Sequence, residues 1–176
     1  MDIFSHGLYG GVALGRKSKK DYLIAFLFGI GPDLLSFGPF VLSAMLGFGA
    51  WPNGGPKSSD AISDLGPFGK LPIFPDIVHF LYSATHSLVI YALFFALLWW
   101  LGKKNFTKLT LAWPLHILVD IPTHSADFFP THFLWPVSNF FIDGISWARP
   151  IIFIPNVIII LILYLYWYMK KRKIKV

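Results

Sequence analysis

Long apolar blocks separated by short basic clusters are the feature that most constrains the fold of this chain. Residues 22–48, 77–101 and 151–169 contain few charged side chains, whereas Lys and Arg gather before the first of these blocks, after the second and after the last one. About 20 consecutive apolar residues are enough for a helix to cross the hydrocarbon core of a bilayer. The sequence is 55% hydrophobic, above the roughly 45–50% of an ordinary soluble domain. We therefore expect residues 1–176 to form one integral membrane domain that is all α-helical.

The predicted architecture is a multi-pass transmembrane helical bundle with about four full spans. Loops are expected over residues 51–75 and 122–150. With this arrangement the basic clusters all fall on one side, which the positive-inside rule makes cytoplasmic. The expected location is the cell membrane, with the C-terminus in the cytoplasm. The spans are predicted at residues 22–48, 77–101, 109–121 and 151–169.

Glycine and proline predict where the helices pack closely and where they end. A short Gly-rich helix is expected over residues 3–15, because glycines at four-residue spacing let a neighbouring helix approach the backbone. The Gly31-Pro32 pair is expected to kink or break the first long span. The third span is expected to end before Pro122, since a residue that precedes proline disfavours the helical conformation.

The residue composition limits the chemistry that the chain can perform. It has no cysteine, which excludes disulfides, thiolate metal sites and cysteine nucleophiles. Any metal must therefore be held by nitrogen and oxygen. All nine acidic residues are Asp, a bias that favours acids placed for local chemistry. The net charge of +6 comes from the terminal and loop clusters, so we interpret it as a topology signal and expect no nucleic-acid partner.

Ionisable side chains from three predicted spans fall at one depth. At a rise of about 1.5 Å per residue, Asp33, His86 and Asp120 lie roughly 12–14 Å below the outer surface. His116 is one turn deeper than Asp120 on the same helical face, and His6 lies about one turn below that surface. Groups at such a depth are costly unless they are paired, hydrated or bound to a cation. Interhelical hydrogen bonding is one interpretation, and the convergence of five groups favours a functional site.

Residues beside these groups are candidates for supporting them. Asp33 adjoins backbone carbonyls that Pro32 frees, and such carbonyls are tolerated in a membrane only where they line a polar site. Thr85 and Ser87 flank His86. They can orient its ring, as metal-bound histidine normally requires, or they can bond back to their own helix.

Several short motifs follow one another in a specific order and spacing: His6, Pro32-Asp33, Thr85-His86-Ser87, His116 with Asp120, Thr123-His124 and Trp135-Pro136. In that order they resemble the predicted membrane-bound metal-dependent hydrolase family. Leu35 stands where this family commonly has a second Asp, and Leu81 stands where it often has a further His. His124 and Asp127 add polar candidates in the turn after Pro122. The resemblance implies metal binding and, with it, a hydrolytic reaction.

The expected function is hydrolysis by a metal-activated water. One or two divalent ions, zinc foremost with manganese or iron as alternatives, would lower the pKa of the bound water. Asp33 or His124 would serve as general base or acid. A site near the outer leaflet fits a membrane lipid or a lipid-linked ester or phosphoester as substrate. The predicted metal ligands are His6, Asp33, His86, His116 and Asp120.

Two other classes of function stay open at this stage. An ion- or proton-coupled transport or binding protein would use the same His and Asp groups, as ionisable chains in carriers do. Inverted repeats would favour transport and none is evident, although a homo-oligomer could supply a second half. A purely structural membrane protein predicts that substitutions at these residues change stability and nothing else.

Overall fold

The computed structural model describes residues 1–45, 74–127 and 129–173. Within these ranges all regular structure is helical and no strand occurs, which confirms the predicted all-α fold class. The loop predicted over residues 51–75 lies outside the described residues as far as residue 73. The helices are α1 (Ile3–Leu14), α2 (Lys19–Met45), α4 (Phe74–Thr85), α5 (Leu88–Trp100), α6 (Lys104–Leu109), α7 (Ala112–Thr123) and α8 (Pro150–Lys173).

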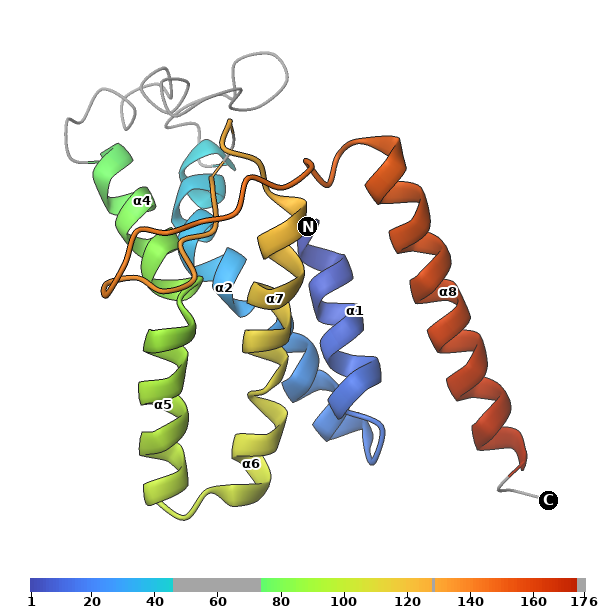
Figure 1. Ribbon diagram of the computed structural model, residues 1–176. Helices are drawn as coiled ribbons and strands as arrows, with labels where there is room; N and C mark the ends of the chain where they lie inside the picture. The colour runs from blue at the N-terminus through green and yellow to red at the C-terminus, as the bar shows by residue number, and fades with distance from the viewer. Residues whose placement is uncertain (46–73, 128, 174–176) are drawn as a thin grey trace.

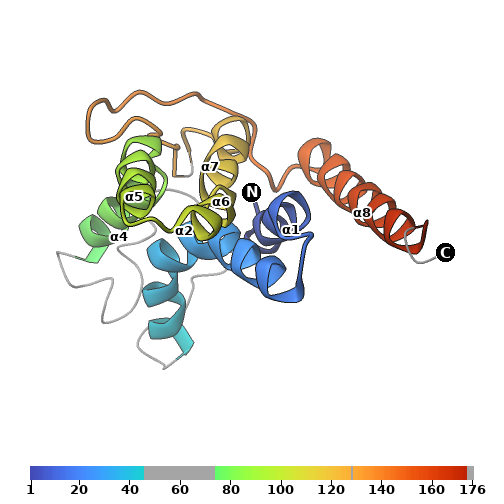
Figure 2. The ribbon, with the colours of Figure 1, turned by 90° about the horizontal axis from the view of Figure 1, so that it is seen from below.

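Helices α1, α2 and α7 pack against one another in the middle of the bundle (Figure 1). Helix α4 packs on α2. Helix α5 follows α4 in the chain and is joined through α6 to α7. Helix α8 stands on the other side of α1 from α4 and α5 (Figure 2). Polar contacts tie α8 to α1: Tyr9 donates to Asn156 at 2.8 Å, and the Tyr164 hydroxyl donates to the Leu8 carbonyl at 3.0 Å.

Glycine lets α1 lie directly on its neighbours, both at the glycines with the predicted four-residue spacing and at two further glycines. A Cβ atom on Gly10 would come within 2.6 Å of the Ala25 carbonyl oxygen, and one on Gly29 would come within 2.5 Å of the His6 carbonyl oxygen. Small residues at helix contacts allow backbones to approach in this way. The contact at Gly29 holds His6 of α1 against α2.

The helices that are long and apolar enough to cross a membrane are fewer than the four predicted. Among the described residues they are Lys19–Pro39 of α2 and Pro150–Lys171 of α8. Val78–Thr85 and Leu88–Trp100 are long and apolar enough only when taken together, and they are bent by 59° at their junction. They add a third crossing only if this bent pair is one span. The predicted span over residues 109–121 corresponds to α7, whose 12 residues cover only about 18 Å.

The helix breaks differ in part from the predicted ones. Of the predicted kink or break at Gly31-Pro32, the break does not occur, since α2 runs unbroken through Pro32. The proline removes only one backbone hydrogen bond, and α1 and α7 both pack on α2. The predicted continuous span 77–101 is instead divided at His86 and Ser87. Ser87 caps α5 by accepting hydrogen bonds from two of its backbone N–H groups.

Helix α7 does not end before Pro122, as the sequence analysis predicted, but extends to Thr123. A proline in the last turn costs a single backbone hydrogen bond. His124, the first residue after α7, completes the last turn, because its N–H donates to the Asp120 carbonyl at 3.0 Å.

Candidate metal centre

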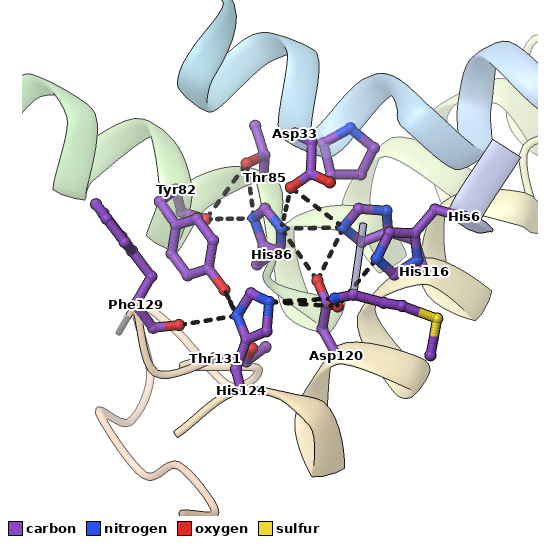
Figure 3. Close-up of polar contacts among 12 residues, drawn as sticks. His6, Asp33, Tyr82, Thr85, His86, His116, Asp120, His124, Phe129 and Thr131 are labelled. Atoms are coloured by element: carbon purple, nitrogen blue, oxygen red, sulfur yellow. Dashed lines mark hydrogen bonds and ion pairs between the residues drawn. The ribbon is translucent and has the colours of Figure 1, made fainter. Parts of the chain in front are cut away.

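Four buried side chains meet at the centre of the bundle (Figure 3). We call Asp33, His86, His116 and Asp120 the four-residue cluster. Each offers one ligand atom, and these atoms all lie within 4.8 Å of one another. The cluster joins α2, the break between α4 and α5, and α7.

The shortest contacts of the cluster run between histidine Nε2 atoms and carboxylate oxygens. His116 Nε2 lies 3.1 Å from Asp120 Oδ2, and His86 Nε2 lies 3.5 Å from the same oxygen. Asp33 Oδ1 is 3.4 Å from His86 Nε2 and 3.8 Å from His116 Nε2. Every member therefore contacts at least two others, and all are shielded from solvent.

The other ring nitrogen of each histidine faces a backbone carbonyl outside the cluster. His86 Nδ1 lies 3.0 Å from the Tyr82 carbonyl, and His116 Nδ1 lies 2.7 Å from the Gly29 carbonyl. A carbonyl oxygen can only accept, so Nδ1 carries the hydrogen in both rings, and Nε2 of a neutral ring presents its lone pair to the cluster. Metal-binding histidines are oriented by outer contacts of this kind.

The two Nε2 atoms lie only 3.0 Å apart. If both rings are neutral with Nδ1 protonated, neither Nε2 has a hydrogen to donate, and their lone pairs repel. Two carboxylates, Asp33 and Asp120, face the same space, and burying such charges without a partner is expensive. A metal ion shared by these groups resolves both problems. Without it, an extra proton on one ring and the Met1 amino group, which contacts Asp120, share the compensation.

The donor set fits a divalent transition metal. Four nitrogen and oxygen ligands from His and Asp suit zinc, and they suit manganese and iron as well. One donor atom of the cluster, Asp120 Oδ2, is buried and makes no hydrogen bond within the described structure. A group that can hold a metal ion is thus present, and the identity of the metal stays a prediction.

Two more histidines approach Asp120 from the side of its other oxygen. His6 Nε2 lies 3.0 Å from Asp120 Oδ1, and the His6 ring stacks on His116 with 3.6 Å between ring centroids. His124 Nε2 lies 3.6 Å from Asp120 Oδ1. The Met1 amino group also contacts this oxygen.

All five predicted ligands thus gather in one place, together with His124. The candidate Asp127 does not, because it is exposed. His79 also lies apart from the cluster and stacks on Phe129 with 5.0 Å between centroids. Leu35, where the resembled family has an acid, is 56% exposed, and so an acid there would lie outside the cluster.

The two residues that flank His86 differ in their roles. Thr85 Oγ1 lies 3.1 Å from His86 Nδ1, where it can orient the ring, and it also bonds back to its own helix by donating to the Leu81 carbonyl at 2.8 Å. Thr85 thus combines the two predicted roles. Ser87 has neither role, because it caps α5 and donates to the Trp135 carbonyl.

Tyr82 is the residue at the site that sequence reasoning missed. Its ring stacks on His86 with 3.9 Å between centroids, and its hydroxyl lies 2.7 Å from His124 Nδ1. It precedes His86 by four residues, so it occupies the same helical face, and this spacing was a usable signal.

Comparisons with protein-family models, with curated proteins and with solved structures gave no match. The resemblance to a metal-dependent hydrolase family therefore stays a prediction from the motifs. The geometry of the cluster stands independently of it.

Proposed function

We propose that this chain is a membrane-embedded metal-dependent hydrolase that acts on a lipid or a lipid-linked ester or phosphoester. The observation that supports it most is the four-residue cluster, in which two carboxylates and two Nε2 lone pairs face one another. Donors arranged in this way favour a divalent cation. When bound, such a cation lowers the pKa of a water ligand and polarises the oxygen of an ester or phosphoester.

The chain's own residues have separate tasks in this proposal. Asp33, His86, His116 and Asp120 hold the ion, and His124 accepts or returns a proton through Nε2. The His124 ring is fixed for this task, because its Nδ1 lies 2.7 Å from the Tyr82 hydroxyl and 3.1 Å from the Phe129 carbonyl. Asp33 is a second candidate for the base.

The surroundings of the cluster favour an amphiphilic substrate. Leu34, next to Asp33, and Leu118, between His116 and Asp120, are both exposed apolar side chains. The turns that carry the ligands thus present hydrocarbon on their outer side. A lipid can keep its tails there while its head group approaches the polar residues, which a water-soluble substrate does less readily.

The proposed topology keeps four crossings with the basic clusters and the C-terminus in the cytoplasm. Helices α6 and α7 are separated only by Thr110 and Leu111 and follow one path beside α5 (Figure 1). Residues 104–123 together cover about 30 Å at a rise of 1.5 Å per residue, which matches a hydrocarbon core of about 30 Å.

The proposal predicts that lipid turnover depends on bound metal. The purified chain, supplied with mixed phospholipid vesicles, is expected to release head groups or fatty acids above background. Chelation followed by dialysis should reduce this release at least about tenfold, since an activated water is lost. Adding zinc, manganese or iron back should restore it. Mass spectrometry of the lipid extract measures both steps.

The same preparation distinguishes the competing transport function. Vesicles that contain the chain are loaded with a metal-sensitive dye, and ion entry is followed while the lipids are analysed. Metal-dependent ion flux without any change in the lipids would contradict the hydrolase proposal.

A further inference from the structure

The carboxylate of Asp120 faces two different sets of histidines. Its Oδ2 atom points to His116 and His86, whose Nε2 atoms lie at 3.1 and 3.5 Å. Its Oδ1 atom points to His6 and His124, whose Nε2 atoms lie at 3.0 and 3.6 Å. Only the first set belongs to the four-residue cluster. The second set contacts the other oxygen of the same carboxylate (Figure 3).

His6 is a buried imidazole with no hydrogen bond at either ring nitrogen within the described structure. Its side chain is 1% exposed, and its Nε2 atom is directed at Asp120 Oδ1. Leaving buried polar atoms without hydrogen bonds is unfavourable. Such a ring is therefore expected to have a ligand that supplies the missing interaction.

The tautomer of His124 also directs a lone pair to this place. The Phe129 carbonyl, 3.1 Å from Nδ1, can only accept, so Nδ1 carries the hydrogen. The Tyr82 hydroxyl, 2.7 Å from Nδ1, accepts as well and is free to donate to Thr131 Oγ1 at 3.2 Å. In the neutral ring, Nε2 of His124 then directs its lone pair at Asp120 Oδ1.

The Met1 amino group lies beside two of these residues. It contacts Asp120 Oδ1 and lies 3.2 Å from His124 Nε2. A metal ion bound to both of these atoms would displace it.

We propose that a second divalent cation binds between His6, His124 and Asp120 Oδ1, with the Asp120 carboxylate bridging it to the ion of the four-residue cluster. The inference rests on the proposed function only in taking the first ion to be a metal. In two-metal sites the ions lie about 3.5–4 Å apart and act on the same substrate group. His124 would then be a ligand of the second ion rather than the proton acceptor.

Metal stoichiometry tests this second site. The full chain is purified in detergent, loaded with zinc and measured by elemental analysis against protein concentration. Two zinc ions per chain are expected for the unchanged protein and one for His6→Ala and for His124→Ala. His79→Ala is the matched control, because His79 lies outside both sets, and it should keep two.

Manganese gives a readout that a merely structural role would not produce. Two manganese ions bridged by a carboxylate are magnetically coupled, so their electron paramagnetic resonance spectrum is expected to differ from that of an isolated ion. His6→Gln, which keeps the side chain polar, should convert the coupled spectrum into an isolated one while the chain stays monodisperse.

The outcomes separate this inference from the proposed function. One ion per chain in the unchanged protein, with no loss in His6→Ala, would overturn the second site and leave the first intact. No bound metal in any preparation would overturn both.

Discussion

Asp120→Asn is expected to remove all bound metal from the protein. The substitution keeps the size of the side chain but removes the charge that faces four histidines, from 3.0 to 3.6 Å away. Loss of outer contacts alone weakens metal binding by about 10–100-fold, so loss of a shared ligand should weaken it by at least about 100-fold. Metal content after gel filtration measures the effect.

The matched control for this prediction is Asp127→Asn. Asp127 is an exposed aspartate on the turn after α7, and its substitution should leave metal content unchanged. Equal metal content in the Asp120 and Asp127 variants would show that Asp120 is not a ligand.

Gly29→Ala is expected to destabilise the bundle and to weaken metal binding together. Its Cβ atom would come within 2.5 Å of the His6 carbonyl, and forcing extra atoms into a packed contact costs about 1–3 kcal/mol. The Gly29 carbonyl also accepts from His116 Nδ1 at 2.7 Å, so a displaced backbone should disturb that ring. A lower midpoint of thermal unfolding in detergent and a higher dissociation constant for zinc are expected.

Gly31→Ala provides the comparison on the same helix. A Cβ atom on Gly31 meets nothing within 4 Å, and alanine favours a helix by about 1 kcal/mol over glycine. This variant should be as stable as the unchanged protein or slightly more so. If both glycine variants lose the same stability, the close contact of α1 with α2 is not what holds the site.

The convergence of the site could be predicted because it depends on charge and helix geometry. Asp33, His86 and Asp120 were placed at one depth from the positions of Lys and Arg and from the rise of a helix. The structure brings these three side chains together, with His86 Nε2 at 3.4 and 3.5 Å from the two carboxylates. Ionisable side chains in apolar segments are costly to bury unless they are paired, so contact with one another is expected.

The local course of the helices could not be predicted in the same way. His86 lies at a break because Ser87 caps α5 and donates to the Trp135 carbonyl, a residue 48 positions away. Gly31-Pro32 predicted a kink or a break, and the helix does not break there, because α1 and α7 pack on α2. Such outcomes depend on tertiary contacts, which the helix propensities of the local residues do not include.

The residues that orient the histidines could not be predicted from the sequence, for a related reason. The carbonyl of Phe129, which contacts His124, belongs to a loop without regular structure. The carbonyl of Gly29, which contacts His116, is a backbone atom that no side-chain pattern marks. Backbone acceptors become visible only when the fold is known.

The most direct test of the central claim is X-ray absorption spectroscopy of the purified, zinc-loaded chain. A cation shared by the four-residue cluster predicts nitrogen and oxygen ligands at about 2.0–2.2 Å, with the outer-shell scattering of imidazole rings. That imidazole scattering should fall when His86 and His116 are both replaced by alanine. A zinc spectrum without imidazole scattering, or one that the double substitution leaves unchanged, would contradict the account.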